Sequence, residues 1–199
     1  MASDFHTHFP HPGKRELVNG GKGCAPLWSL PFHPWETGAF PEKILEEDLQ
    51  QCAALGEVGF DKFKGRLPYP AEQLDLCRKF LELAEKFRKP VVLHAVGSPD
   101  PLFRFKKDFP ETPMLIHGFS KHNPLLLGQL LDGGFYVSLH PSLIADEKII
   151  MFLRSRPGCR AGLETDDNGN LAIEDLYAQI DIPGFEQAAD AHFREFLQI

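Results

Sequence analysis

The feature that most constrains the fold is a regular alternation of short apolar runs with longer helical patterns. The apolar runs are rich in β-branched and aromatic residues, a composition typical of strands that are buried on both faces of a parallel sheet. Five of these runs begin at Val58, Pro90, Pro113, Gly134 and Cys159. Helical patterns cover residues 42–55, 71–87 and 123–134. Strands and helices in turn predict an α/β fold with right-handed crossovers.

Three further candidate strands stand before these runs: "DFHTH", "RELVN" and "APLWSLPF". They bring the total to about eight, the number that a closed (β/α) barrel needs. Such barrels usually have about 250 residues, whereas this chain has 199. The segment from Phe9 to Pro34 is too short and too rich in Gly and Pro for two crossover helices. We therefore expect one domain, residues 1–199, folded as a compact, distorted (β/α)8 TIM-like barrel with helices reduced beside the first strands. A doubly wound open sheet is the alternative.

Reduced helices would leave apolar barrel surface beside the first strands uncovered. A C-terminal helix is the favoured cover, because its apolar residues share one side at helical spacing. They are Phe185, Phe193, Phe196 and Leu197. The loop around residues 28–35 and a second subunit are the other candidates, so the oligomeric state, monomer or dimer, stays open.

The composition argues against several classes of protein. A net charge of -7 disfavours a broad, sequence-blind nucleic-acid surface, yet it permits a local basic groove. We expect neither a signal peptide nor a membrane span, because no basic segment precedes an apolar run and no run is long enough. The four cysteines are scattered without paired spacing, which predicts reduced thiols in a cytoplasmic protein.

Histidine and carboxylate side chains recur at the C-terminal ends of the predicted strands, the edge where parallel α/β folds build active sites. His6 and His8 alternate on a strand, so both point to one face. The full set is His6, His8, Glu57, His94, His117 and Asp166. Each residue alone could be a structural histidine or a helix cap. Together, imidazole and carboxylate suit Zn, Mn, Fe or Co and can also hold Mg, so the sequence predicts a metal site.

The ordered motifs "DFHTHF", "LGEVGFD", "PVVLH", "LIHGFSK" and "LETDD" resemble those of the TatD family of metal-dependent hydrolases, within the amidohydrolase superfamily. The similarity runs from Ser3 to the C-terminal tail, and the compact length is similar to that of short bacterial TatD-like proteins. The resemblance implies a distorted barrel with two divalent metal ions, Zn, Mn or Mg. It also implies hydrolysis of phosphodiester bonds, with DNA as the favoured substrate.

The resemblance also implies a role for each candidate ligand. One metal ion would be held by His6, His8 and Asp166, the other by His94 and His117, with Glu57 as the bridge and Asp4 as a supporting carboxylate. Glu57 and Asp166 are then the predicted catalytic residues. Asp166 would accept the proton of the nucleophile and return it to the leaving group.

Substrate binding is predicted for His33, Lys62 and Lys121, which follow predicted strands, with Lys64 and Arg66 as further positive charges. Trp28 and Trp35 could stack a base, although packing in the core is favoured for Trp28. Two other functions stay open. One is a metallohydrolase that cleaves a small ester, lactone or amide, and the other is a metal-binding protein without turnover.

Overall fold

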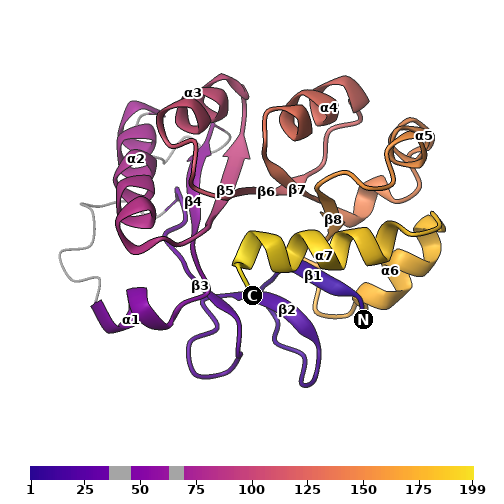
Figure 1. Cartoon of the computed structure of the whole chain (residues 1–199), viewed down its shortest axis with the longest axis horizontal. Coiled ribbons are helices and arrows are strands. Elements are labelled where there is room, and N and C mark those ends of the chain that lie inside the picture. Colours follow the sequence, from indigo (N-terminus) through magenta and orange to yellow (C-terminus); the bar gives the residue numbers. More distant parts are fainter. Residues whose placement is uncertain (36–45, 63–69) are drawn as a thin grey trace.

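The computed structural model describes residues 1–35, 46–62 and 70–199, and eight strands lie in these ranges. The strands are β1 (Ser3–Thr7), β2 (Arg15–Asn19), β3 (Trp28–Leu30), β4 (Ala54–Asp61), β5 (Val91–Val96), β6 (Met114–Phe119), β7 (Tyr136–Leu139) and β8 (Ala161–Leu163). They pair in parallel in sequence order, and β8 pairs with β1 to close the ring (Figure 1). The predicted closed barrel is confirmed, and the open sheet is excluded.

The helices that lie between and after these strands are α1 (Glu46–Gln51), α2 (Pro70–Phe87), α3 (Asp100–Asp108), α4 (Pro124–Asp132), α5 (Glu147–Ser155), α6 (Ile173–Ile180) and α7 (Phe185–Leu197), with a 3-10 turn, η1 (Pro141–Leu143). The predictions at 71–87 and 123–134 are confirmed by α2 and α4. The prediction at 42–55 is wrong at its end, because Ala54 and Leu55 begin β4 and pair with β3. Both are fully buried, as a strand in the barrel wall requires. Residues 42–45 lie outside the described ranges.

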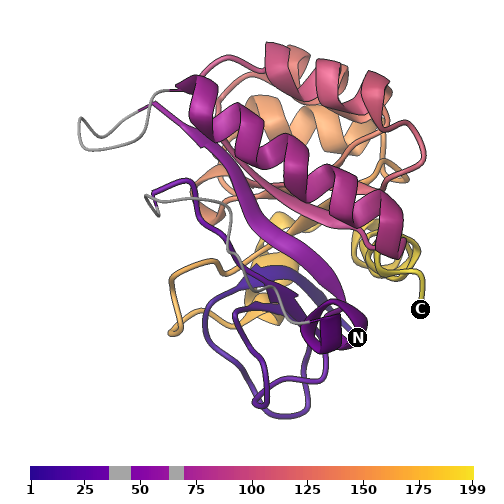
Figure 2. The same cartoon turned by 90° about the vertical axis from the view of Figure 1, so that its left-hand side faces the viewer.

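The first strands lack the usual crossover helices. Within residues 1–35 the connections from β1 to β2 and from β2 to β3 contain no helix. Helices α2 to α5 lie on one side of the barrel, and the loops that join β1, β2 and β3 lie on the opposite side (Figure 2). The predicted reduction of helices beside the first strands is therefore confirmed.

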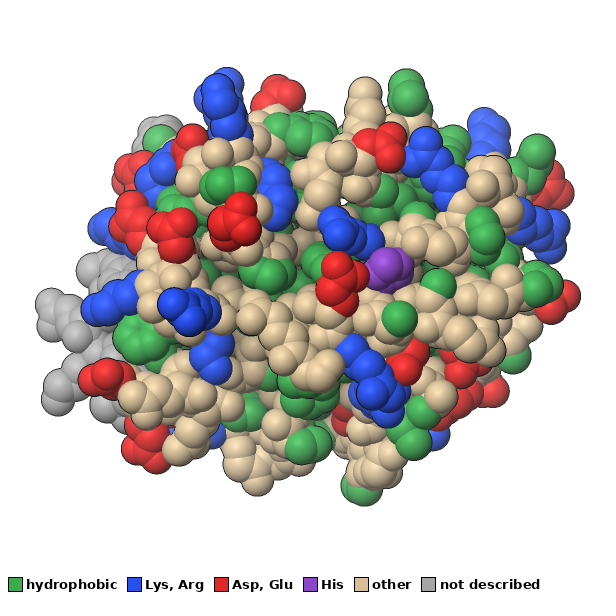
Figure 3. Space-filling model, viewed as in Figure 1, with side chains coloured by type: hydrophobic (Ala, Val, Ile, Leu, Met, Phe, Trp, Pro, Cys, Tyr) green, Lys and Arg blue, Asp and Glu red, His purple; other side chains and the backbone are tan. Residues whose placement is uncertain are grey.

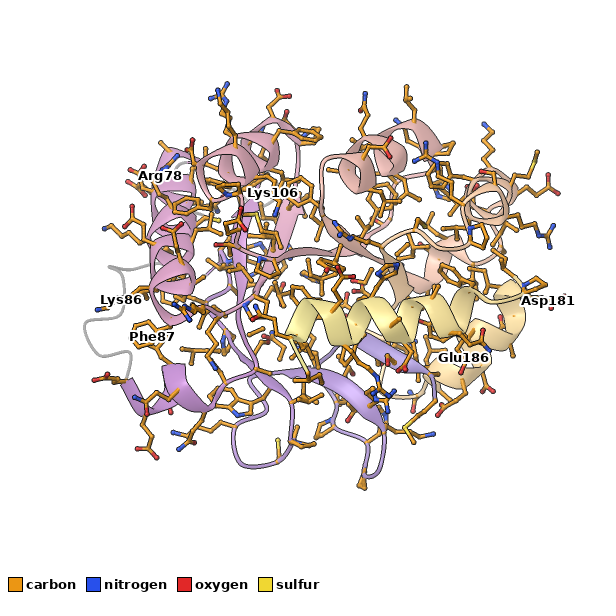
Figure 4. The ribbon with its side chains drawn as sticks, in the orientation of Figure 1. Arg78, Lys86, Phe87, Lys106, Asp181 and Glu186 are labelled. Atoms are coloured by element: carbon orange, nitrogen blue, oxygen red, sulfur yellow. The ribbon has the colours of Figure 1, made fainter. Side chains whose placement is uncertain are left out.

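The C-terminal helix takes over part of their packing. Helix α7 contacts β1 and β8, and the rings of Phe5 and Phe193 meet edge to face at 5.3 Å between centroids. Phe185, Phe193 and Phe196 are fully buried on this contact side. Asp181, labelled in Figure 4, ends α6 in the left-handed region just before α7 begins. The prediction that this helix covers the first strand is confirmed.

Charged side chains of both signs lie on the surface of the molecule (Figure 3). Figure 3 shows acidic and basic side chains interspersed over the face it presents. All four cysteines are free thiols, with Cys52 and Cys77 buried. Among the helices of the described ranges, none combines the length and the apolar character that crossing a bilayer demands.

Candidate metal centre

The fold brings the six candidate ligands to the C-terminal end of the barrel. His6 lies in β1, Glu57 in β4, His94 in β5 and His117 in β6. His8 directly follows β1, and Asp166 lies in the loop after β8. Glu57 is central, because it extends from β4 toward both sets of histidines, and its side chain is 3% exposed.

One carboxylate oxygen of Glu57 faces the histidines of the first strand. Its Oε2 lies 3.5 Å from His6 Nε2 and 3.7 Å from His8 Nε2. The Oδ1 atom of Asp166 lies 3.8 Å and 3.6 Å from the same two nitrogens. Donor atoms of His6, His8 and Asp166 all lie within 4.8 Å of one another, so these residues could hold one ion.

The other oxygen of Glu57 faces a second set of imidazoles. Its Oε1 lies 2.8 Å from His94 Nδ1, 3.0 Å from His117 Nε2 and 3.3 Å from His33 Nε2. His33, predicted to bind substrate, thus reaches the same oxygen as two predicted ligands. Donor atoms of His33, Glu57 and His94 lie within 4.8 Å of one another, as do those of His6, Glu57 and His117.

Local backbone geometry holds these side chains in place. A Cβ on Gly59 would lie 2.0 Å from the carbonyl oxygen of His94, so only glycine lets β4 approach β5 this closely. Asp166 has φ of 52°, a left-handed conformation that is uncommon outside glycine and is found at functional sites. Its amide donates to the carbonyl oxygen of His6 at 3.0 Å, and its own carbonyl oxygen accepts from the amide of His8 at 2.9 Å.

The buried histidines of the cluster are held neutral. Burial lowers the pKa of His6, and burial together with the neighbouring His6 lowers the pKa of His117 to about 4. Burial opposes ionisation of Glu57, but the surrounding imidazoles, His117 first, outweigh it and lower the pKa of this carboxyl. A neutral imidazole beside an ionised carboxylate is the form in which both groups bind metal.

The donor set fits a divalent cation. Both ring nitrogens of His6 and Nδ1 of His117 are buried without a hydrogen-bond partner among the described residues. Buried polar atoms are rarely left in this state, and an ion is one of the accepted explanations. Nitrogen and carboxylate oxygen together suit Zn, Mn or a related ion.

Three polar residues of the site were not predicted from the sequence. Asn19 Nδ2 donates to Glu57 Oε2 at 3.1 Å, and Asp61 Oδ2 lies 3.3 Å from His94 Nε2. Glu164 is fully buried and shares a cluster with His117 and Asp166. Burial, and then the charge of Asp166, raises the pKa of Glu164 well above its usual range. Asn19 and Asp61 end their strands, so the strand-end rule that selected the ligands could have found both.

The supporting carboxylate Asp4 lies in β1 and is buried. Its carboxylate accepts hydrogen bonds from the amide of His6 at 3.2 Å and from the hydroxyl of Thr165 at 2.7 Å. Burial raises the pKa of Asp4 to about 7, against the hydrogen bonds from Thr165. The carboxyl thus links the strand of His6 to the residue before Asp166.

The predicted cationic residues lie at the edge of the site. Lys62 is exposed and its alkyl chain lies against Gly97 after β5. Lys121 lines a pocket that also includes His117. Lys64 and Arg66 lie outside the described residues. Trp28 is 5% exposed, which confirms its packing in the core, whereas Trp35 is 43% exposed.

Comparison with known proteins identifies a family for most of the chain. The family described as TatD related DNase matches residues 25–168, more than half of the chain, and this span includes four of the six candidate ligands. The human protein named deoxyribonuclease TATDN3 is 25% identical over 126 residues, which are 62% of this chain and 46% of that protein. An uncharacterized metal-dependent hydrolase of Methanocaldococcus jannaschii is 29% identical over 99 residues, 46% of this chain and 37% of that protein. The chain thus matches less than half the length of each of these curated relatives.

Solved structures agree on the fold. The crystal structure of YjjV, a TatD homolog from Escherichia coli, superposes with a TM-score of 0.74 at 20% identity, covering 100% of this chain and 98% of that one. A TatD family hydrolase from Entamoeba histolytica gives a TM-score of 0.64 at 13% identity, with 100% and 95% covered. The extent of the family match, carried on a closed barrel with this cluster, shows that the chain belongs to the TatD related DNase family.

Proposed function

We propose that this protein is a metal-dependent hydrolase that cleaves phosphodiester bonds at two divalent ions held at the end of the barrel. The observation that carries the proposal is the position of Glu57, whose two carboxylate oxygens face two separate imidazole sets. A carboxylate in this position can bridge two cations. The family relationship supports the same reaction.

The proposed ligands form two sets, one facing each carboxylate oxygen of Glu57. His6, His8 and Asp166 would hold one ion, and His94 and His117 the other, with Glu57 shared. When bound, a pair of such ions supplies a water nucleophile at neutral pH and neutralises charge on the phosphoryl oxygens.

Asp166 is the proposed general base. Its side chain is 22% exposed, whereas that of Glu57 is 3% exposed, so Asp166 is the carboxylate that an incoming water can reach. It would take the proton of the attacking water and return it to the leaving oxygen. The backbone bonds to His6 and His8 hold Asp166 for this step.

Substrate contacts are proposed for three residues at the rim. His33 lies beside Glu57 with its side chain 23% exposed, so it can reach both the cluster and a ligand from solvent. Lys62, directly after β4, and Lys121, after β6, would supply positive charge for a phosphodiester. A cytoplasmic location, supported by the four free thiols, belongs to the same proposal.

A second candidate is hydrolysis of a small ester, lactone or amide. It is favoured by the pocket beside His117, whose lining includes the buried apolar residues Leu102, Ile116 and Leu130. A pocket of this character suits a compact apolar group better than a polynucleotide backbone.

Metal analysis followed by a substrate panel tests the proposal. Protein purified without chelator should carry two divalent ions per chain. It should cleave a phosphodiester faster than matched carboxylic esters, lose activity with chelator, and regain it with Zn, Mn or Mg. Bound metal with ester cleavage alone would favour the second candidate, and bound metal without any turnover would leave a metal-binding protein.

A further inference from the structure

Trp35 is a large aromatic side chain exposed at the edge of the proposed metal centre. Trp35 is 43% exposed, whereas Trp28, the other tryptophan of the chain, is 5% exposed. The ring of Trp35 meets the ring of His33 edge to face, with 4.7 Å between centroids. An exposed flat apolar ring thus lies beside a residue of the cluster.

The indole of Trp35 is held in one orientation. Its Nε1 donates to Asp61 Oδ2 at 2.8 Å, and its backbone amide donates to His33 Nδ1 at 3.1 Å. Gln73 anchors the same region, because its Oε1 accepts from the amide of Asp61 at 2.9 Å and its Nε2 donates to the carbonyl oxygen of Pro34 at 3.2 Å. A ring fixed before binding loses little conformational entropy when a ligand stacks on it.

Polar contacts and ring contacts connect the indole of Trp35 to the candidate ligands. The oxygen of Asp61 that accepts from Trp35 also lies 3.3 Å from His94 Nε2. The rings of His33 and His94 lie 4.6 Å apart between centroids, and His33 Nε2 lies 3.3 Å from Glu57 Oε1. A planar group on the indole would therefore be a direct neighbour of a bond positioned at the cluster.

We infer that Trp35 is a platform on which an unpaired nucleobase of the substrate stacks, next to the phosphodiester that is cleaved. The inference rests on the proposed function and narrows its substrate class to the nucleotides of a single strand or of a frayed end. Aromatic stacking suits a chain of net charge -7 because it provides affinity without a broad basic surface. Every base has a flat face, so the site would tolerate different sequences.

A fluorescence titration tests the contact without any turnover. The Trp28→Phe variant leaves Trp35 as the single tryptophan. We expect a thymidine dinucleotide to quench the emission of this metal-loaded variant, and the matched abasic dinucleotide to leave it unchanged. Equal effects of the two probes would overturn the inference. Quenching without hydrolysis would instead contradict the proposed function and leave the platform standing.

Substitution of the ring gives a second test in the otherwise unchanged chain. Trp35→Ala should raise KM, or Kd where turnover is absent, by about tenfold for base-bearing probes. It should leave abasic probes and metal content unchanged, and Trp35→Phe should show a smaller loss because a ring remains. A purely structural role for Trp35 would weaken base-bearing and abasic probes alike, and that result would overturn the inference.

Discussion

The amide of Asp166 donates a hydrogen bond to the carbonyl oxygen of His6 at 3.0 Å, so residues 160 positions apart in sequence share one backbone junction. The amide of His8 completes the junction by donating to the carbonyl oxygen of Asp166 at 2.9 Å. The carboxylate of Asp166 is therefore fixed by backbone bonds that do not depend on the side chain. Substitution of this carboxylate can test its chemistry with the fold retained.

Asp166→Asn should fold normally and lose about 10²–10⁴-fold in kcat, because an amide cannot accept the proton of the nucleophile. Steady-state rates at saturating metal, with thermal melting of both proteins, measure the effect. Asp167→Asn, at the exposed neighbouring position, is the matched control and should retain activity. Turnover like that of the wild type in Asp166→Asn would assign the proton transfer to another group.

Glu57→Gln should lower the affinity for both proposed ions together, because one carboxylate faces both imidazole sets. Titration of the metal-free protein with Mn or Zn should show both binding steps weakened. Glu16→Gln removes another buried carboxylate, one that bonds His11 outside the cluster, and it should retain both ions. Loss of only one ion in Glu57→Gln would refute its role as the bridge.

The metal-free protein should lose stability as the pH falls from about 6.5 toward 4. Burial lowers the pKa of His117 to about 4, so between these values the unfolded chain binds a proton that the folded chain does not. Each unit of difference corresponds to about 1.4 kcal/mol in the free energy of unfolding. Burial also lowers the pKa of His6, which adds to the loss of stability at low pH. Glu57 and Asp61 raise the pKa of His94 against its burial, so protonation of His94 opposes that loss.

Urea unfolding at several pH values, with chelator present, measures this dependence. His117→Asn should flatten the slope between pH 4 and 6.5. An unchanged slope in His117→Asn would show that other groups govern the acid sensitivity.

His33→Gln separates a substrate contact from a metal ligand. If His33 binds substrate, KM should rise by up to about tenfold, the typical worth of a hydrogen bond, and bound metal should not change. Metal analysis of the variant and its KM are the two measurements. A drop in bound metal at unchanged KM would make His33 an additional donor beside Glu57 and His94, as their spacing allows.

Helix α7 should be necessary for the stability of the barrel although it carries none of the proposed ligands. Phe193 is fully buried against Phe5, so Phe193→Ala should cost about 3–5 kcal/mol in the free energy of unfolding. Met151→Ala, at a position that is 70% exposed, should have little effect. Truncation after Asp181 should be still more destabilising; a truncated chain that melts with the full-length protein and keeps its metal would contradict the role of α7.

The alternation of strands and helices could be predicted from the sequence because the strands in the middle of the chain are apolar on both faces. The run of β4, for example, is buried at every position, and runs of that kind occur chiefly in parallel sheets. The start of β4 was misread because "CAAL" continues the helical pattern before it, and alanine and leucine favour helices until packing decides otherwise. Strand order and closure rest on pairing between distant segments, which no local pattern contains.

The candidate ligands could be selected because strand ends meet at one edge of the barrel. Glu164 was passed over for a physical reason. It ends the apolar run that begins at Cys159, and this local pattern does not show that the carboxyl is fully buried in one cluster with His117 and Asp166. The exposure of Trp35 also depends on tertiary packing, since neighbouring sequence does not separate it from the buried Trp28.

The closure of β1 against β8 and α7 has a consequence for synthesis on the ribosome. Phe5 and His6 emerge long before Asp166 and Phe193, their partners. Contacts of such sequence separation form late and slow the folding of a domain. The nascent chain must therefore carry β1 with an uncovered phenylalanine and an incomplete set of ligands until Asp166 and Phe193 have been translated.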